Sequence, residues 1–230
     1  MTNAHLPMDN SFSGSRAKST RTQFVRRVRR VQRDVLLMGA LVENSFLLAC
    51  NALFERDLSA ARHIKGQDKQ IDRFYRQIEL DCVSLLALQV PASQDLRHLS
   101  ALMQLVRDLE RIGDYAVDLG EIAIKLFPYS AHPCLGDIQT MAERCRAMLA
   151  MSLASLSDLD AQAGLDMKIK DDAVDEEYAN LYTVLAHQRD IQGVVEPIVL
   201  LVLVIRHLER MADHATNIGK RVAYIVTGQR

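Results

Sequence analysis

The feature that most constrains this chain is an internal duplication that keeps acidic side chains in register. Residues 107–114 return 99 positions later as residues 206–213, and residues 68–75 return 103 positions later as residues 171–178. The matched acids are Glu110 with Glu209, Asp114 with Asp213, Asp68 with Asp171 and Asp72 with Asp175. A chain of 230 residues that carries one acidic unit twice is expected to fold as two similar halves. Retention of these acids in both copies indicates that they have a function.

Both copies have the periodicity of helices. Apolar residues from Phe24 to Phe46 recur at steps of three and four, and no segment alternates with a period of two over a useful length. The predicted helices cover residues 20–61, 66–89, 93–126, 137–159, 165–187 and 194–227. We therefore expect an all-α fold of two tandem three-helix bundles, similar to spectrin repeats and lying end to end or side by side. The predicted divisions are a disordered tail at 1–19, a first bundle at 20–127, a linker at 128–136 and a second bundle at 137–230.

Composition predicts a cytoplasmic protein. The four cysteines form no CxxC pair and no zinc spacing, which favours reduced thiols over a disulfide framework. The N-terminus has no apolar signal core. The longest apolar run, residues 198–205, has eight residues, whereas a membrane-spanning helix needs about 20.

The acids of each half are expected to share one face of a helical hairpin. Residues four apart on an α-helix lie on nearly the same side, so Glu110, Asp114 and Asp118 form one row. If the second and third helices are antiparallel, Asp72 lies level with Glu110 and Asp68 lies level with Asp114, because both helices rise equally per residue. The corresponding pairs in the second half are Asp175 with Glu209 and Asp171 with Asp213.

These oxygen-rich patches predict metal sites. Carboxylate oxygens suit Mg, Mn and Fe, with Zn also allowed. Four or more acids exceed the charge of one divalent ion, which favours a multinuclear cluster or a site completed by water or an anion. The candidate ligands are Asp68, Asp72, Glu110, Asp114, Asp118, Asp171, Asp175, Glu209, Asp213 and Asn217. Asn217 stands where the first copy has Asp118, and its amide oxygen is the poorer ligand.

The alternative interpretation is an acidic face that is simply solvated. Four arginines lie beside the acids in the sequence and could neutralise them within their own helices. They are Arg107, Arg111, Arg206 and Arg210. Duplication and level pairing together favour metal binding over this alternative.

A basic segment precedes the first acidic patch. Residues 16–33 hold eight Lys and Arg side chains, and Asp9 is the only acid before Asp34. Beyond residue 33 the chain has 20 basic and 28 acidic side chains, a net charge of −8. The predicted contacts with an anionic partner are Arg26, Arg27, Arg29 and Arg30. An anionic membrane face is favoured over nucleic acid, because the chain has no Trp and few aromatic residues on which bases could stack.

Taken together, these motifs resemble the PhoU family of phosphate transport regulators. The family's repeated E(D)xxxD motif in a double three-helix bundle is matched by residues 110–114 and 209–213. Residues 38–39, 68–72 and 91–97 agree as well, and the resemblance spans about residues 22–228. It implies a cytoplasmic, non-catalytic protein that negatively regulates the high-affinity phosphate ABC transporter and the phosphate-starvation two-component response. It also implies iron or zinc clusters, frequent homodimers, and the transporter's ATPase subunit and a sensor histidine kinase as partners.

A rival hypothesis is a ferritin-like di-metal carboxylate enzyme or metal store. That design uses a Glu-x-x-His motif from each of two helices, and the sequence contains none. His207 and His214 flank the second acidic motif, but the first motif has no histidines at the matching positions. The sequence also lacks a P-loop, a dinucleotide-binding glycine loop and a nucleophile elbow. We therefore expect a protein that is not an enzyme.

Overall fold

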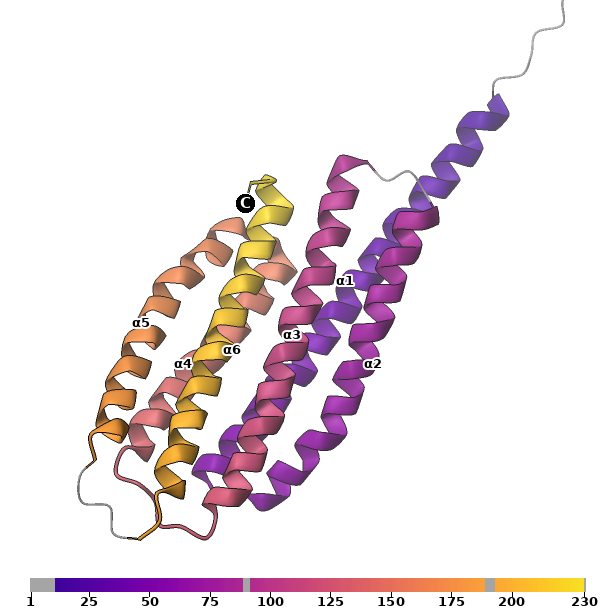
Figure 1. The fold of residues 1–230 in the computed structure, drawn as a ribbon. Coiled ribbons are helices and arrows are strands. Elements are labelled where there is room, and N and C mark those ends of the chain that lie inside the picture. The colour runs from indigo at the N-terminus through magenta and orange to yellow at the C-terminus, as the bar shows by residue number, and fades with distance from the viewer. Residues whose placement is uncertain (1–10, 89–91, 189–192, 230) are drawn as a thin grey trace, which may run out of the picture.

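The computed structural model describes residues 11–88, 92–188 and 193–229, and the regular structure in these ranges is entirely helical. The helices are α1 (Ser11–Phe54), α2 (Leu58–Leu88), α3 (Ser93–Leu126), α4 (Leu135–Asp158), α5 (Ala161–Ala186) and α6 (Glu196–Thr227). Figure 1 shows α1–α3 as one three-helix bundle and α4–α6 as a second, lying side by side. The all-α prediction of two bundles is confirmed, and the side-by-side arrangement is the one adopted.

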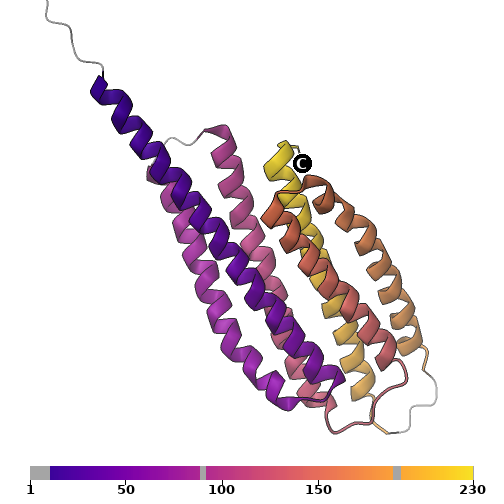
Figure 2. The same cartoon turned by 180° about the vertical axis from the view of Figure 1, so that it is seen from behind.

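The two bundles meet along two seams. The larger seam joins α3 to α6, which run antiparallel (Figure 1), and the smaller one joins α1 to α4 behind them (Figure 2). Apolar side chains of both halves, among them Met38, Leu105 and Leu208, are fully buried in one continuous core. Because apolar burial is the main force for folding, the halves form one body.

Helix α1 starts earlier than the sequence predicted. It begins at Ser11, so the prediction of disorder is wrong for residues 11–19, while residues 1–10 lie outside the described part of the chain. Once a helix is anchored by packing, each added residue gains a hydrogen bond at little cost, and this stretch has no proline to stop it.

The boundary between α1 and α2 was also misplaced. Helix α1 ends at Phe54 instead of near residue 61, because Arg56 adopts a left-handed backbone with φ of 57°. The Asp57 carboxylate then accepts hydrogen bonds from the backbone N–H groups of Ser59 (2.8 Å) and Ala60 (3.2 Å). This is an N-cap, and α2 therefore begins well before the predicted residue 66.

Helix α5 begins at Ala161 rather than at 165 for the same kind of reason. The Asp160 carboxylate accepts from the N–H groups of Gln162 and Ala163, both at 3.0 Å. Gly164 lies inside the helix, where an added Cβ would come within 2.5 Å of the Gly219 carbonyl oxygen. The backbones of α5 and α6 thus nearly touch. The predicted bounds of α3, α4 and α6 agree closely with the structure, and the hairpin turns expected near residues 91 and 192 lie outside the described residues.

Helix α1 combines a core face with an apolar composition. By length and composition alone, its Arg21–Phe54 part would suffice to cross a membrane, but half of the apolar window is buried inside the bundle. Val35, Met38 and Val42 are fully buried, as expected for a core helix. All four cysteines are free and buried, in agreement with the prediction of reduced thiols.

Candidate functional site

The first acidic patch lies between α2 and α3. Burial, and then the negative charges of Asp72 and Asp114, raise the pKa of Asp68. Burial also raises the pKa of Glu110, where repulsion from Asp114 and Asp72 adds to the effect and Arg111 opposes it. The carboxylates of the two helices therefore act on one another, as the level pairing of a helical hairpin predicts.

Arginines partly neutralise this patch. Arg111 places Nη1 3.1 Å from Asp114 Oδ2 and Nε 3.6 Å from Glu110 Oε2, and Arg76 Nη2 lies 3.1 Å from Asp72 Oδ2. Both arginines are exposed, and ion pairs of this kind contribute little to stability. The solvated-face interpretation is thus seen in part, but Asp68 has no ion pair among the described residues.

Asp118 lies at the rim of the first patch. It is exposed, and its charge adds to the burial that raises the pKa of Asp114. Its counterpart Asn217 is half-buried on α6. The row of three side chains on α3 therefore faces the same side, with the outermost member in contact with solvent.

The second patch lies between α5 and α6. Burial, and then the charge of Asp171, raise the pKa of Asp175. Burial raises the pKa of Glu209 as well, although Arg206 opposes this by donating to Glu209 Oε1 at 2.7 Å. The other oxygen, Glu209 Oε2, is buried and has no hydrogen-bond partner. Arg210 lies 3.4 Å from Asp213, so this patch also holds its arginines at its edge.

A lysine enters only the second patch. Lys168 Nζ lies 3.0 Å from Oδ2 of the buried Asp171 and 2.8 Å from Oδ1 of Asp172. The matching lysine of the first half, Lys65, instead lies 2.8 Å from Glu121 Oε1 on α3. Both patches therefore have arginines at their edges, but in the described residues a lysine lies beside the acids of the second patch and not beside those of the first.

Neither patch has its side chains arranged to coordinate a metal ion in the described part of the structure. Among the described residues, no group of three or more His, Cys, Asp and Glu side chains is gathered closely enough to hold a metal ion. The donor chemistry nevertheless fits a hard cation, because the facing groups are carboxylates that repel one another and Glu209 Oε2 lacks a partner. Holding a metal requires these side chains to turn toward a shared ion.

A polar contact across the α3–α6 seam was not predicted from the sequence. Asp108, which is 9% exposed, places Oδ1 2.8 Å from His214 Nδ1, and the rings of Tyr115 and His207 lie 5.3 Å apart. Positions 108 and 207 match in the repeat, as do 115 and 214. The two contacts are therefore equivalent under exchange of the halves. The signal was present in the repeat, but the antiparallel docking of the halves is not visible in the sequence.

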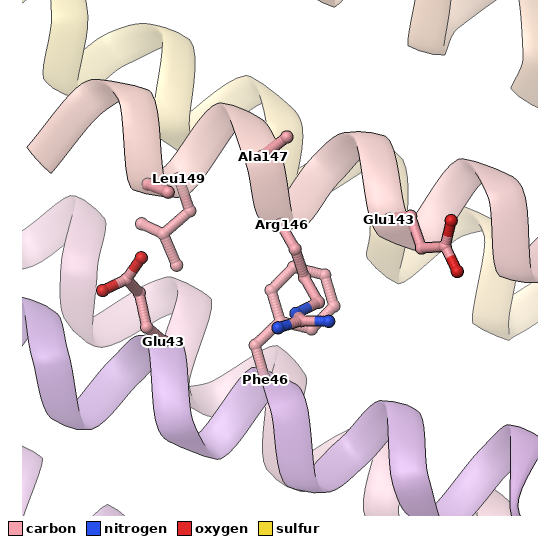
Figure 3. Close-up of a pocket in the computed structure, with 7 residues that line it drawn as sticks. Glu43, Phe46, Glu143, Arg146, Ala147 and Leu149 are labelled. Carbon is pink, nitrogen blue, oxygen red and sulfur yellow. The ribbon is translucent and has the colours of Figure 1, made fainter. Parts of the chain in front are cut away.

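A hollow of about 280 Å³ lies apart from both patches, between α1 and α4. Figure 3 shows Arg146 of α4 beside Phe46 of α1, and Glu43 lies on α1 as well. Burial raises the pKa of Glu43, and Arg146 opposes this rise. No residue predicted as a site lines this hollow.

The fold and the paired acidic faces define a class of duplicated three-helix-bundle proteins. Within that class, the PhoU domain matches residues 35–123 and again residues 138–222. The chain therefore belongs to the PhoU family, and the resemblance noted in the sequence is confirmed.

Relatives and solved structures agree over nearly the whole chain. A phosphate-specific transport system accessory protein PhoU homolog of Synechocystis sp. is 60% identical over 210 residues, which cover 91% of this chain and 94% of the relative. The homolog of Pseudomonas aeruginosa is 32% identical over 90% of this chain and 86% of its own length. The crystal structure of PhoU from Pseudomonas aeruginosa matches with a TM-score of 0.84 at 31% identity, covering 90% of this chain and 100% of that one. The phosphate transport system regulatory protein PhoU of Streptococcus pneumoniae matches with a TM-score of 0.82 at 28% identity, covering 90% and 98%.

Proposed function

We propose that this protein is a cytoplasmic, non-catalytic regulator of phosphate transport. It would restrain a high-affinity phosphate ABC transporter through the ATPase subunit and help a sensor histidine kinase silence the phosphate-starvation response. The observation that carries the proposal is the 60% identity, over 91% of this chain, to a relative named as an accessory protein of the phosphate-specific transport system. The histidines do not favour the ferritin-like alternative, since His214 is engaged by Asp108 and His207 by Tyr115 at the seam.

We further propose that the acidic patches bind Fe, Zn, Mn or Mg ions. Asp68, Asp72, Glu110 and Asp114, with Asp118 at the rim, would hold the ion in the first half. The second-half ligands would be Asp171, Asp175, Glu209, Asp213 and Asn217. A bound cation would supply the positive charge that these mutually repelling carboxylates lack, and would fix α2 against α3 and α5 against α6. Binding in this way orders a surface and requires no reaction.

Regulation can be tested in a strain that lacks the protein. We expect a phosphate-starvation reporter to be active there even when phosphate is plentiful, and expression of the wild-type chain to silence it. A reporter that responds normally to phosphate without the protein would contradict the regulatory proposal. Metal binding is tested separately, by elemental analysis of the purified protein.

The metal test compares the wild type with a variant in which both central motifs are neutralised. The changes are Glu110→Gln, Asp114→Asn, Glu209→Gln and Asp213→Asn. We expect metal in the wild type and its loss in the variant, with helical content unchanged by circular dichroism. A matched control neutralises four exposed acids outside the patches by Glu55→Gln, Asp137→Asn, Asp158→Asn and Asp166→Asn, and should keep its metal. Equal loss in the control, or no metal in a reconstituted wild type, would contradict metal binding.

Self-association is proposed as well. The expected assembly is a homodimer, to be measured by sedimentation equilibrium of the purified chain. A mass of one chain at all concentrations would contradict it.

A further inference from the structure

One exposed face of α1 carries a row of positive charge that ends in a leucine. Arg26, Arg30, Arg33 and Leu37 follow one another at steps of four, three and four, and at 3.6 residues per turn they fall within about 60° around the helix. All four are exposed, Leu37 by 55%. Arg29 flanks the row on the same side. We name these five residues the basic face.

The charge of the basic face is almost uncompensated. Within the described residues, Arg26, Arg29 and Arg33 have no acidic partner, and Arg30 comes only within 3.8 Å of Asp34. Arg21, which lies nearer the start of the helix, is by contrast paired with Asp95 of α3. A folded protein that needed these arginines only for its own stability would pair them as it pairs Arg21.

The basic face lies on the uncovered side of the packed part of α1, whose opposite side is buried at Val31 and Val35. Figures 1 and 2 show α1 extending beyond the ends of α2 and α3. Arg26, Arg29 and Arg33 line an open hollow of about 620 Å³ together with Gln32 and Leu36. The positive charge is thus presented along one open side of α1, next to its projecting start.

We propose that the basic face docks on the anionic headgroups of a lipid bilayer. Guanidinium groups match phosphate oxygens well, and a straight row on one helix can meet a flat surface all along its length. Leu37 at the end of the row would enter the headgroup layer. The inference goes beyond the proposed function, because lipid binding by the purified chain holds whether or not a transporter is regulated.

A nucleic acid fits this face less well. Phe24, two residues before Arg26 in the sequence, is 1% exposed and offers no stacking surface. Beyond residue 33 the chain carries a net charge of −8, which would repel a long polyanion lying along the molecule. A membrane need touch only the basic face.

The test is co-sedimentation of the full-length protein with vesicles at near-physiological salt. One set of vesicles contains only zwitterionic phosphatidylcholine, and the other also contains anionic phosphatidylglycerol. We expect binding to the anionic vesicles alone. The triple variant Arg26→Gln, Arg30→Gln, Arg33→Gln should lose about fivefold in partition coefficient for each arginine removed.

Two further variants separate charge from other effects. The triple variant Arg62→Gln, Lys125→Gln, Lys170→Gln removes equal charge from exposed positions elsewhere and should bind as the wild type does. Changing Arg26, Arg30 and Arg33 to Lys should keep most of the binding. Equal binding to both kinds of vesicle, no binding to either, or equal loss in the control would overturn the proposal. Tighter binding to a short DNA duplex in the same buffer would overturn it in favour of nucleic acid.

Discussion

The two acidic patches have the same central carboxylates but different cations around them. In the first half Glu121 holds Lys65 at 2.8 Å, away from the acids. The matching residue in the second half is Lys220, which cannot attract a lysine, and Lys168 stays with Asp171 at 3.0 Å. A reversal of charge outside the candidate ligands thus accompanies the different placement of a lysine common to both repeats, and we infer that it causes the difference.

Duplicated sites can therefore diverge without any change in their central acids. A lysine ammonium group beside Asp171 competes with an incoming cation, and the replacement of Asp118 by Asn217 removes a further negative charge. Both differences make the second patch less negative. We therefore expect the first patch to bind cations more tightly.

The largest expected effect is on metal affinity when one patch is removed. The first-half variant is Asp68→Asn, Glu110→Gln, Asp114→Asn, and the second-half variant is Asp171→Asn, Glu209→Gln, Asp213→Asn. Losing direct ligands should cost at least as much as losing outer-shell partners, so we expect a loss on the order of 100-fold at the altered patch. In Mn²⁺ titrations by calorimetry, the tighter phase should vanish only in the first-half variant. Loss of the tighter phase in the second-half variant would reverse the comparison.

Exchanging the charges of Glu121 and Lys220, which differ between the halves, should produce the next largest effect on Mn²⁺ affinity. With Glu121→Lys, Lys65 loses its partner and turns to Asp68, three residues along, so the first patch should bind Mn²⁺ about tenfold less tightly, or ~1.4 kcal/mol. Lys220→Glu should draw Lys168 away and strengthen the second patch by a similar factor. Adding Lys65→Gln to the Glu121→Lys protein should restore the first patch. Unchanged affinities in both exchanges would refute the steering role.

A smaller effect is expected on the stability of the metal-free protein. Lys168→Met leaves the buried carboxylate of Asp171 without its ion pair, so the free energy of unfolding should fall by about 1 kcal/mol. Lys65→Met breaks a pair between two exposed side chains and should cost less. Urea unfolding in the presence of a chelator measures both values. Equal losses would show that the two lysines are equivalent after all.

The smallest effect on stability is expected at Glu43, which lies between the two halves and outside either patch. Burial raises the pKa of Glu43 above its ordinary value of 4.5, so the ionised carboxylate is disfavoured in the folded protein. Its penalty is present at neutral pH and disappears as the pH falls through the raised pKa toward 4.5. Glu43→Gln should therefore stabilise the protein at pH 7 and flatten this part of the pH profile. Solvent screening limits the gain to less than about 0.5 kcal/mol, and a destabilised variant would contradict it.

Spacing alone predicted the patches but not what surrounds them. Asp72 and Glu110 could be paired from the sequence, because antiparallel helices with equal rise fix which residues are level. Lys65 and Lys168 have the same spacing to an aspartate, so their different partners depend on side chains of the neighbouring helix. Such a contact between helices has no signature in the periodicity of either one.

The end of α1 at Phe54 was not predicted, for a different reason. Nothing in the helix propensity of Arg56 warns of a left-handed residue, although Asp57 two positions before Ser59 is a capping signal that could have been used. The contact of Asp108 with His214 needed the docking of the two halves, which no local pattern encodes. Local rules therefore predicted the elements, and tertiary contacts decided their ends and partners.

The α3–α6 seam also bears on the history of the chain. In the repeat, His207 corresponds to Asp108 and His214 corresponds to Tyr115. Exchanging the two halves therefore places the Asp108–His214 contact on the Tyr115–His207 contact, so the positions in contact across the seam are related by a twofold arrangement. Such an isologous surface is the interface that two identical chains form around a twofold axis. An ancestor with a single repeat would have had the geometry to pair through α3. Fusion of two copies would then have freed each copy of the seam, and of the acidic patch beside it, to change independently of the other.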